Sequence, residues 1–322
     1  MLVLAGDIGG TNTRLCLVET DGKNESTLRE EIYPSGNEGL VPLVRQFLGD
    51  ESNVYKACFA LAGPVLNNKC KITNLPWPEL DAAQLEEELN IAKVSLINDF
   101  VAIGYNIVLE KNKSLVTLQE GEFLPDAPIA IIGAGTGLGK AFAVPEGDSY
   151  RVFPTEGGHE SFAPDSLLAE ELLAYLRADG KVDVERVVSG PGIVDIFCFL
   201  RDRKFASEDA GDFLSQSDPG AAIAKGAAAG HFLCQQTMAI FVEAFGAAAG
   251  DMAVSFLPFG GLYIAGGIAA QNIELMRNGS FIKVFTDKAR VNPVLLEKVP
   301  VHIVLNTLEG LRGAVKYAAT KM

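Results

Sequence analysis

Asn98 and Asp99 are the first residues whose types and position suggest chemistry. They directly follow Val94–Ile97, an apolar run of strand length. Carboxylates are rare inside strands, and ligands of α/β proteins bind at the carboxyl ends of strands. This position predicts that Asp99 accepts a proton from a bound hydroxyl group and that Asn98 holds another hydroxyl. The competing interpretation is that Asp99 caps a helix that begins here.

A second polar group is Glu156-Gly157-Gly158-His159, which follows a predicted strand at 151–153. Recognition of a polyol requires several donors and acceptors that converge on one ring, and a carboxylate beside an imidazole supplies both. A metal ion could use the same two side chains, but the sequence offers no third ligand nearby. The local sequence around Glu185, which lies beside Arg186, predicts only an exposed ion-pair partner.

The chain opens with a glycine-rich turn between two apolar runs. Gly9 and Gly10 allow backbone N–H groups to approach an anion, and Thr11 adds a hydroxyl donor. Asp7 would repel a phosphate directly, so we expect it to act through Mg²⁺ or its waters. An ordinary β-hairpin has the same glycine pattern, so this turn alone leaves a structural role open.

A second glycine-rich segment, Gly133–Gly139, follows the apolar run Ile129–Ile132. The next residues, Ala141–Val144, predict a strand, whereas a dinucleotide fingerprint would continue as a helix. Lys140 lacks the following Ser or Thr of a Walker A loop. The pattern therefore predicts a second phosphate-contacting hairpin with Thr136 as its side-chain donor.

The remaining sequence predicts strands that alternate with helices, which is typical of α/β proteins with largely parallel sheets. Each half begins with a strand, a glycine turn and another strand, which indicates a duplicated scaffold around phosphates. Small residues in one alanine-rich helix, with Gly246 inside it, predict tight helix packing. The predicted strands are 2–6, 13–19, 55–62, 94–97, 128–132, 141–144, 151–153 and 261–265. The predicted helices are 39–48, 80–89, a segment after Asp99, 166–178, 191–200, 219–229, 232–249, 271–278 and 308–320.

Length and charge restrict the function further. The 322 residues suit two domains better than one. With 41 acidic and 27 basic residues the formal net charge is −14, which disfavours a nucleic-acid partner. The densest basic run, Arg201, Arg203 and Lys204, reads as a solvated surface loop.

Cysteine usage and hydropathy predict a cytoplasmic protein without a membrane partner. The 5 cysteines are dispersed, which indicates reduced thiols, and with only 3 histidines they do not suggest structural zinc. The N-terminus reaches Asp7 too early for a signal peptide. Residues 252–273 carry no charge, but Pro258 and several glycines interrupt them, which disfavours a membrane span.

Together these motifs resemble the bacterial glucokinases of the actin-like, hexokinase-like superfamily, over nearly the whole chain. The matching segments are Gly6–Arg14 (first phosphate motif), Thr73–Trp77 (a strand segment near the sugar), Ile97–Phe100 (catalytic segment), Gly133–Gly139 (second phosphate motif), Glu156–His159, Glu185–Gly190 and Ala265–Ile268 (adenosine pocket).

The resemblance implies ATP-dependent phosphorylation of glucose at its 6-hydroxyl to glucose 6-phosphate, the first step of glycolysis. It implies that Asp99 is the general base and that glucose is bound by Asn98, Glu156, His159 and Glu185, which singles out Glu185 beyond its local sequence. The implied nucleotide-binding residues are Gly6, Asp7, Ile8, Gly9, Gly10, Thr11, Asn12, Gly135, Thr136, Gly137, Gly266 and Gly267. Asp7 is the residue implied for Mg²⁺, through water or phosphate.

The resemblance also implies a two-domain actin-like (ribonuclease H-like) α/β fold with a cleft that closes on glucose. The small domain would comprise residues 1–110 and the C-terminal helix 308–322, and the large domain residues 111–307. Related sugar kinases of repressor ancestry carry a cysteine-rich zinc cluster after their glutamate–histidine motif. Residues 160–177 contain no cysteine, so zinc is not expected here.

Several alternatives stay open at this stage. A kinase for another hexose or an amino sugar would share the scaffold, and polyphosphate could replace ATP as donor. A non-catalytic sugar-sensing protein or an actin-like ATPase or chaperone is disfavoured by the combination of Asn98-Asp99 with Glu156–His159. An acidic α/β enzyme of this size is often a homodimer.

Overall fold

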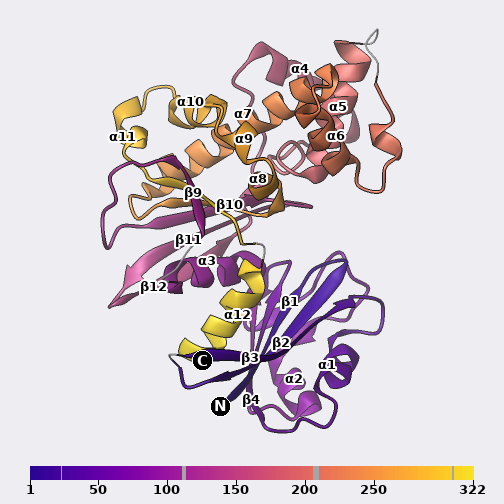
Figure 1. The fold of residues 1–322 in the computed structure, drawn as a ribbon, viewed down its shortest axis with the longest axis vertical. Helices are drawn as coiled ribbons and strands as arrows, with labels where there is room; N and C mark the ends of the chain where they lie inside the picture. The colour runs from indigo at the N-terminus through magenta and orange to yellow at the C-terminus, as the bar shows by residue number, and fades with distance from the viewer. Residues whose placement is uncertain (23, 111–113, 206–209, 307) are drawn as a thin grey trace. The chain divides into compact units, whose positions relative to one another are not determined.

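Two units make up the chain in a computed structural model, which describes every residue except 23, 111–113, 206–209 and 307. The first unit comprises Met1–Lys113, Ser149–Pro154 and Asn306–Met322 (Figure 1). The second comprises Ser114–Asp148 and Thr155–Leu305. The domain boundaries predicted at residues 111 and 307 fall outside the described residues.

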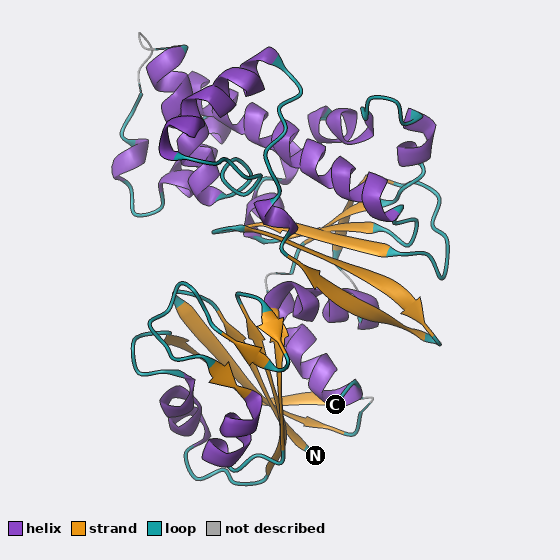
Figure 2. Ribbon diagram, turned by 180° about the vertical axis from the view of Figure 1, so that it is seen from behind, coloured by secondary structure: helices purple, strands orange, loops and turns teal. Residues whose placement is uncertain are grey.

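The first unit is built on a five-stranded sheet in the order β3-β2-β1-β4-β8. Strand β1 pairs antiparallel with β2 and parallel with β4, and β4 pairs parallel with β8. Helices α1 and α2 cover one face of this sheet, and α3 and α12 cover the other (Figures 1 and 2). The strands are β1 (Leu2–Ile8), β2 (Asn12–Thr20), β3 (Glu25–Pro34), β4 (Val54–Leu61) and β8 (Lys93–Asn98), and the helices are α1 (Leu40–Leu48), α2 (Ala82–Leu89), α3 (Asp99–Leu109) and α12 (Glu309–Thr320). A small sheet contains β5 (Val65–Leu66), β6 (Lys69–Cys70) and β7 (Leu80–Asp81).

The second sheet has the order β12-β11-β10-β13-β14-β9. Its strands are β9 (Leu115–Gln119), β10 (Ile129–Ala134), β11 (Leu138–Glu146), β12 (Ser149–Thr155), β13 (Leu262–Ala265) and β14 (Val301–Val304). The helices of the second unit are α4 (Leu167–Leu176), α5 (Gly190–Arg203), α6 (Pro219–Ala228), α7 (Phe232–Phe256), α8 (Gly267–Gln271), α9 (Ile273–Met276), α10 (Ser280–Thr286) and α11 (Pro293–Glu297).

The predicted duplication is confirmed in the order of the strands. In one sheet the hairpin β1–β2 is followed in space by β4 and β8, and in the other the hairpin β10–β11 is followed by β13 and β14. The expectation of largely parallel sheets was wrong in part. Both sheets are mixed, because each glycine turn joins two adjacent strands and so makes them antiparallel.

Helix α7 forms the centre of the second unit's core. Phe241 and Phe245 are almost completely buried. A Cβ at Gly246 would lie 2.5 Å from the carbonyl oxygen of Phe281, which confirms the predicted tight packing, here against α10. Among the described helices α7 alone has the length and apolar composition to cross a membrane, but half of its most apolar stretch is buried inside the protein, as in a core helix.

Three local predictions from the sequence were wrong. Residues 73–77 form a turn and irregular backbone, because prolines on both sides of Trp77 remove the N–H groups that a strand would use. The basic run ends helix α5, where Arg201 pairs with Asp202 at 2.6 Å, and cations are favoured at a helix C-terminus. The helix predicted at 271–278 is two short helices, α8 and α9.

Candidate active site

The predicted site residues divide between the two units. Those from Gly6 to Asn12, together with Asn98 and Asp99, belong to the first unit. Those from Gly135 to Gly137, from Glu156 to His159, and Glu185, Gly266 and Gly267 belong to the second.

The first glycine turn joins β1 to β2, as predicted. The N–H of Gly9 donates to the carbonyl of Asn12 at 3.0 Å and closes the turn. Gly10, Thr11 and Asn12 are exposed, so their backbone is accessible to an anion. Gly6 and Ile8 lie earlier, inside strand β1 and paired on both sides, and their side-chain positions face the core.

Ser35 braces this turn from the end of β3. Its buried hydroxyl donates to the carbonyl of Gly9 at 2.7 Å, and its N–H donates to the carbonyl of Thr11 at 2.9 Å. The hydroxyl also lies 3.1 Å from that of Thr13. Ser35 therefore fixes two carbonyl groups of the turn.

Asp7 lies at the end of β1, opposite Arg14 of β2. Burial raises the pKa of the Asp7 carboxyl, and the Arg14 charge acts in the opposite direction. The backbone of Gly310, in the first turn of α12, packs directly on this carboxylate, since a Cβ there would lie 3.2 Å from Asp7 Cγ. A nearby cation would stabilise the ionised form of a carboxylate in such surroundings.

Asn98 and Asp99 lie where β8 passes into α3, as predicted. Asn98, and not Asp99, is the cap of the helix, because its Oδ1 accepts from the N–H groups of Phe100 and Val101 at 3.0 and 3.3 Å. The other end of the Asn98 amide donates to Asp99 Oδ1 at 2.9 Å and to the carbonyl of Gly63 at 3.2 Å. Asn98 thus orients the Asp99 carboxylate.

The second glycine turn joins β10 to β11, again as predicted. The N–H of Gly135 donates to the carbonyl of Gly137 at 2.8 Å, and the carbonyl of Gly135 accepts from Gly190 at the start of α5 at 2.8 Å. Thr136 is exposed at the tip of the turn. Gly266 and Gly267 follow β13, which pairs in parallel with β10 so that Ala265 lies opposite Gly133.

Glu185 is held against this turn. Its Oε2 accepts from the N–H of Leu138 at 2.8 Å. A Cβ at Gly137 would lie 2.5 Å from the same oxygen, so the carboxylate occupies space that only glycine leaves open. The local interpretation of Glu185 as an ion-pair partner of Arg186 was wrong, because Arg186 pairs with Asp179 and Asp195.

Glu156 precedes a 3₁₀ turn, Gly157–His159, that packs on the start of strand β11. The N–H of His159 donates to the carbonyl of Glu156 at 3.0 Å, and the carbonyl of Gly158 accepts from the N–H of Glu185 at 2.9 Å. A Cβ at Gly158 would overlap the carbonyl oxygen of Leu138. Leu138, the first residue after the glycine turn, is therefore contacted by both the Glu156–His159 turn and Glu185.

His159 and Lys140 each have an acidic partner. His159 Nδ1 lies 2.9 Å from Asp183 Oδ2. This hydrogen bond raises the pKa of His159 most, partial burial lowers it, and the charges of Glu185, Asp183 and Glu156 raise it further. Lys140 runs below the turn, since a Cβ at Gly157 would lie 2.9 Å from Lys140 Cδ, and its buried ammonium pairs with Glu160 at 2.8 Å.

Comparisons with known proteins identify the family. Residues 4–321 match the family model described as Glucokinase. A glucokinase of Nostoc sp. is 50% identical, with 99% of each chain covered. The chain belongs to the glucokinase family. It is therefore an enzyme, a sugar phosphotransferase, as the sequence motifs predicted.

Solved structures of glucokinases share the fold. A glucokinase from an Antarctic psychrotroph superimposes with a TM-score of 0.81 at 29% identity, with 98% of each chain covered. A ROK family glucokinase from Streptomyces griseus, in complex with glucose and AMPPNP, has a TM-score of 0.67 at 19% identity, with 99% of each chain covered. The predicted two-domain actin-like α/β fold is confirmed.

Three residues around the glucokinase motifs were not found from the sequence. Ser35 donates a hydrogen bond to Gly9, and Asp183 lies beside the His159 ring. Lys140 packs against the backbone of Gly157. The sequence offered one indication for Asp183: it stands two residues before Glu185, in a stretch where acidic and apolar residues alternate.

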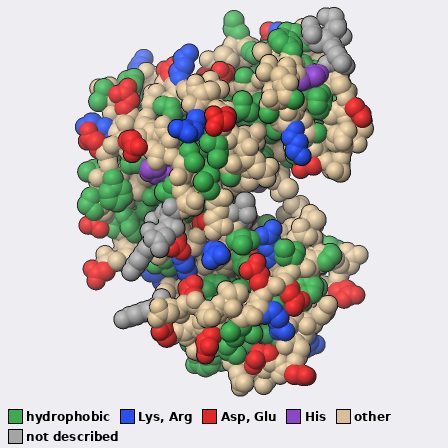
Figure 3. All heavy atoms as spheres, viewed as in Figure 1, with side chains coloured by type: hydrophobic (Ala, Val, Ile, Leu, Met, Phe, Trp, Pro, Cys, Tyr) green, Lys and Arg blue, Asp and Glu red, His purple; other side chains and the backbone are tan. Residues whose placement is uncertain are grey.

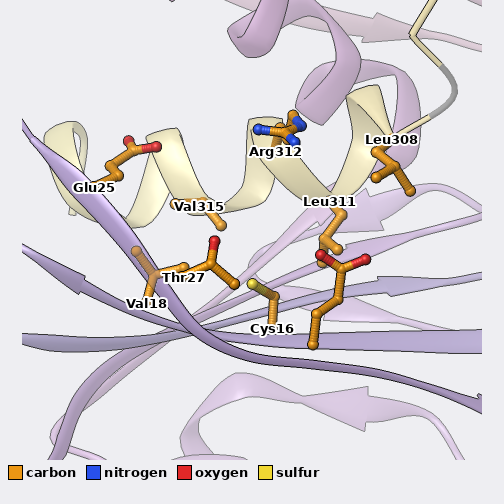
Figure 4. Close-up of a pocket in the computed structure, with 9 residues that line it drawn as sticks. Cys16, Val18, Glu25, Thr27, Leu308, Leu311, Arg312 and Val315 are labelled. Atoms are coloured by element: carbon orange, nitrogen blue, oxygen red, sulfur yellow. The ribbon is translucent and has the colours of Figure 1, made fainter.

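A small cavity of about 40 Å³ lies elsewhere in the first unit, between α12 and strands β2 and β3 (Figure 4). It is lined by Cys16, Glu25, Thr27, Leu311 and Arg312, among others, and by none of the predicted site residues. This volume holds about one or two water molecules, far less than a sugar requires. Burial raises the pKa of the Cys16 thiol to about 11, so this cysteine is an inert core residue.

Charged side chains of both signs are interspersed on the face shown in Figure 3.

Proposed function

We propose that this glucokinase-family enzyme transfers the γ-phosphoryl group of ATP to the 6-hydroxyl of glucose. One observation carries the proposal. Leu138 directly follows a glycine turn of the kind that binds phosphate, and it is contacted by both Glu185 and the turn of Glu156 and His159. Acceptors and a donor suited to sugar hydroxyls thus lie within one residue of a backbone suited to phosphate. The glucose and AMPPNP bound by the Streptomyces griseus glucokinase are the matching pair of ligands.

The base in this reaction is Asp99. As the bond from O6 of glucose to the γ-phosphorus forms and the bond from that phosphorus to the bridging oxygen of ADP breaks, the hydroxyl proton passes to the Asp99 carboxylate. Asn98 orients this carboxylate through its 2.9 Å hydrogen bond. The helix cap that Asn98 also makes keeps the pair rigid.

Glucose is held by Asn98, Glu156, His159 and Glu185. The triphosphate is held by the backbone N–H groups of the two glycine turns, with the hydroxyls of Thr11 and Thr136, and the adenosine lies near Gly266 and Gly267. Asp99 belongs to the first unit and Glu156 to the second.

Mg²⁺ fits the residues present. This ion keeps several waters and binds through one or two carboxylates together with substrate phosphates, and Asp7 is a carboxylate in surroundings that favour a cation. When bound with ATP, Mg²⁺ would neutralise phosphate charge, and Asp7 would hold it through water. No group of three or more His, Cys, Asp or Glu able to hold a metal occurs among the described residues.

Further parts of the proposal concern the cell and the assembly. We place the enzyme in the cytoplasm, at the entry of glucose into glycolysis, and expect a homodimer.

The decisive experiment is a panel of sugars with ATP and Mg²⁺, in which ADP release is measured. We expect glucose to give the highest kcat/KM among glucose, fructose, mannose and N-acetylmannosamine. A higher value for another sugar would assign the enzyme to that substrate. A glucose-induced thermal shift without ADP would indicate a sensor, and ADP release without sugar would indicate an ATPase.

A further inference from the structure

The Asp183–His159 pair determines which protons the imidazole carries. A carboxylate can only accept, so the ring nitrogen 2.9 Å from Asp183 Oδ2, which is Nδ1, must carry a proton. Nδ1 is thereby committed to Asp183, and Nε2 is the ring atom left for a ligand. Asp183 itself is fixed, because its Oδ1 accepts from the N–H of Arg186 at 3.0 Å. The guanidinium of Arg186 is engaged with Asp179 and Asp195.

A donor at Nε2 would complement the neighbouring groups. Glu156 and Glu185 are carboxylates and accept the protons of sugar hydroxyls, whereas a protonated His159 would add a donor to this set. A donor at Nε2, with Nδ1 already protonated toward Asp183, is an imidazolium. If the ring were neutral with its proton on Nε2, a bare Nδ1 would face the Asp183 carboxylate and repel it.

We propose that Asp183 is a positioning residue that keeps His159 a cationic, Nε2-donating ligand for a sugar hydroxyl. This inference rests on the proposed function, because it deepens the role of His159 in binding glucose.

The charges around His159 agree with this assignment. The hydrogen bond that Asp183 accepts from the ring raises the pKa of His159 most, partial burial lowers it, and the charges of Glu185 and Glu156 raise it further. The ammonium of Lys140, whose side chain contacts the turn at Gly157, is paired with Glu160. The side chains of His159 and Asp183 are 57% and 34% exposed, so a ligand can reach the ring and solvent moderates the effect of these charges.

The first test measures the proton directly. With only 3 histidines in the chain, the His159 ring can be followed by NMR and assigned by its loss in His159→Gln. Asp183→Asn should lower the pKa of His159, while its Oδ1 can still accept from Arg186. The matched control is Asp179→Asn, which removes a nearby carboxylate that bonds to Arg186 and not to His159; it should leave the titration unchanged. An unchanged titration in Asp183→Asn would overturn the proposal.

The second test asks whether that proton serves glucose. The imidazolium is lost as pH rises through its pKa, so the KM for glucose should rise with pH in the wild-type protein. Asp183→Asn should move this rise to lower pH, with a KM about tenfold higher near neutral pH, little change near pH ~5, and kcat retained. A KM increase of equal size at every pH would show a merely structural role and refute the proposal.

His159→Gln provides the second variant. Its amide N–H donates without titrating, so its KM should lack the rise with pH, and adding Asp183→Asn should not restore it. A pH-dependent KM in this double variant would contradict the proposal. If the wild-type protein releases no ADP with any sugar, the proposed function fails, whereas the NMR titration still decides whether Asp183 controls the His159 proton.

Discussion

Replacing Gly137 by alanine tests whether the second glycine turn is coupled to Glu185, a proposed sugar ligand. The new methyl carbon would lie 2.5 Å from Glu185 Oε2, whereas ordinary contacts begin at 3.4 Å. The carboxylate must therefore retreat by about 0.9 Å. Since it is the far end of a flexible side chain, it can move away, but it then loses its 2.8 Å hydrogen bond from Leu138.

The size of the effect follows from that bond. A hydrogen bond to a charged group contributes about 1.5–3 kcal/mol, and alanine returns about 0.4–1 kcal/mol by restricting the unfolded chain. The free energy of unfolding should therefore fall by about 1–2 kcal/mol, and Tm by a few degrees. If the displaced Glu185 loses its contact with glucose, the KM for glucose should rise about ten- to hundredfold.

The assay is ADP release as a function of glucose, with Gly135→Ala as the matched control. A Cβ at Gly135 meets nothing within 4 Å, so this variant changes the same turn without touching Glu185. Gly135→Ala should leave the KM for glucose near the wild-type value. Equal increases in both variants, or no increase in Gly137→Ala, would refute the coupling of the turn to Glu185.

Three further variants test other parts of the structure. Asp99→Asn should lower kcat by about 10²–10⁴-fold while glucose binding measured by calorimetry persists, and near-normal turnover would remove Asp99 from its role as base. Glu160→Ala leaves the buried ammonium of Lys140 without a partner and should lower the free energy of unfolding, measured by chemical denaturation, by about 2–4 kcal/mol. Lys140→Met leaves only an exposed carboxylate and should lower it less. The reverse order would contradict this account. Burial raises the pKa of Glu309, which accepts a hydrogen bond from Asn106, so its ionisation costs stability as pH rises through the folded-state pKa. Glu309→Gln should therefore raise Tm near neutral pH and lose this advantage in acid, and a Tm difference independent of pH would count against it.

Regular patterns in the sequence were sufficient to predict the parts of the fold that depend on local structure. The two hairpins could be predicted because apolar runs on both sides of a glycine cluster determine strand, turn and strand together. Strand β3 was missed because it is an edge strand with most side chains exposed on both faces, so no alternation marks it. Strand β9 is half-buried throughout, and β14 has only 4 residues. Helices α10 and α11 are also short and were not predicted.

Candidate site residues could be proposed from the sequence where the residue type itself suggests the chemistry, but their contacts with distant residues could not. Asp99 could be singled out as a carboxylate at a strand end. The competing interpretation, in which Asp99 caps the helix, was wrong: both residue types suit a cap, and Asn98 occupies it. Ser35, Asp183 and Lys140 reach their partners across 26, 24 and 20 residues, and no local pattern encodes such separations.

The two glycine turns, similar in sequence, are built into their units in different ways. The first is braced by the Ser35 hydroxyl on the carbonyl of Gly9, and this brace involves none of the predicted sugar ligands. The second shares its exit residue, Leu138, with Glu185 and with the turn that carries His159. A displacement of the second turn must therefore also move Glu185 and the turn that carries His159, the proposed sugar ligands. In the proposed function, binding of the nucleotide and binding of glucose would thus be mechanically linked in the second unit through the backbone of Leu138.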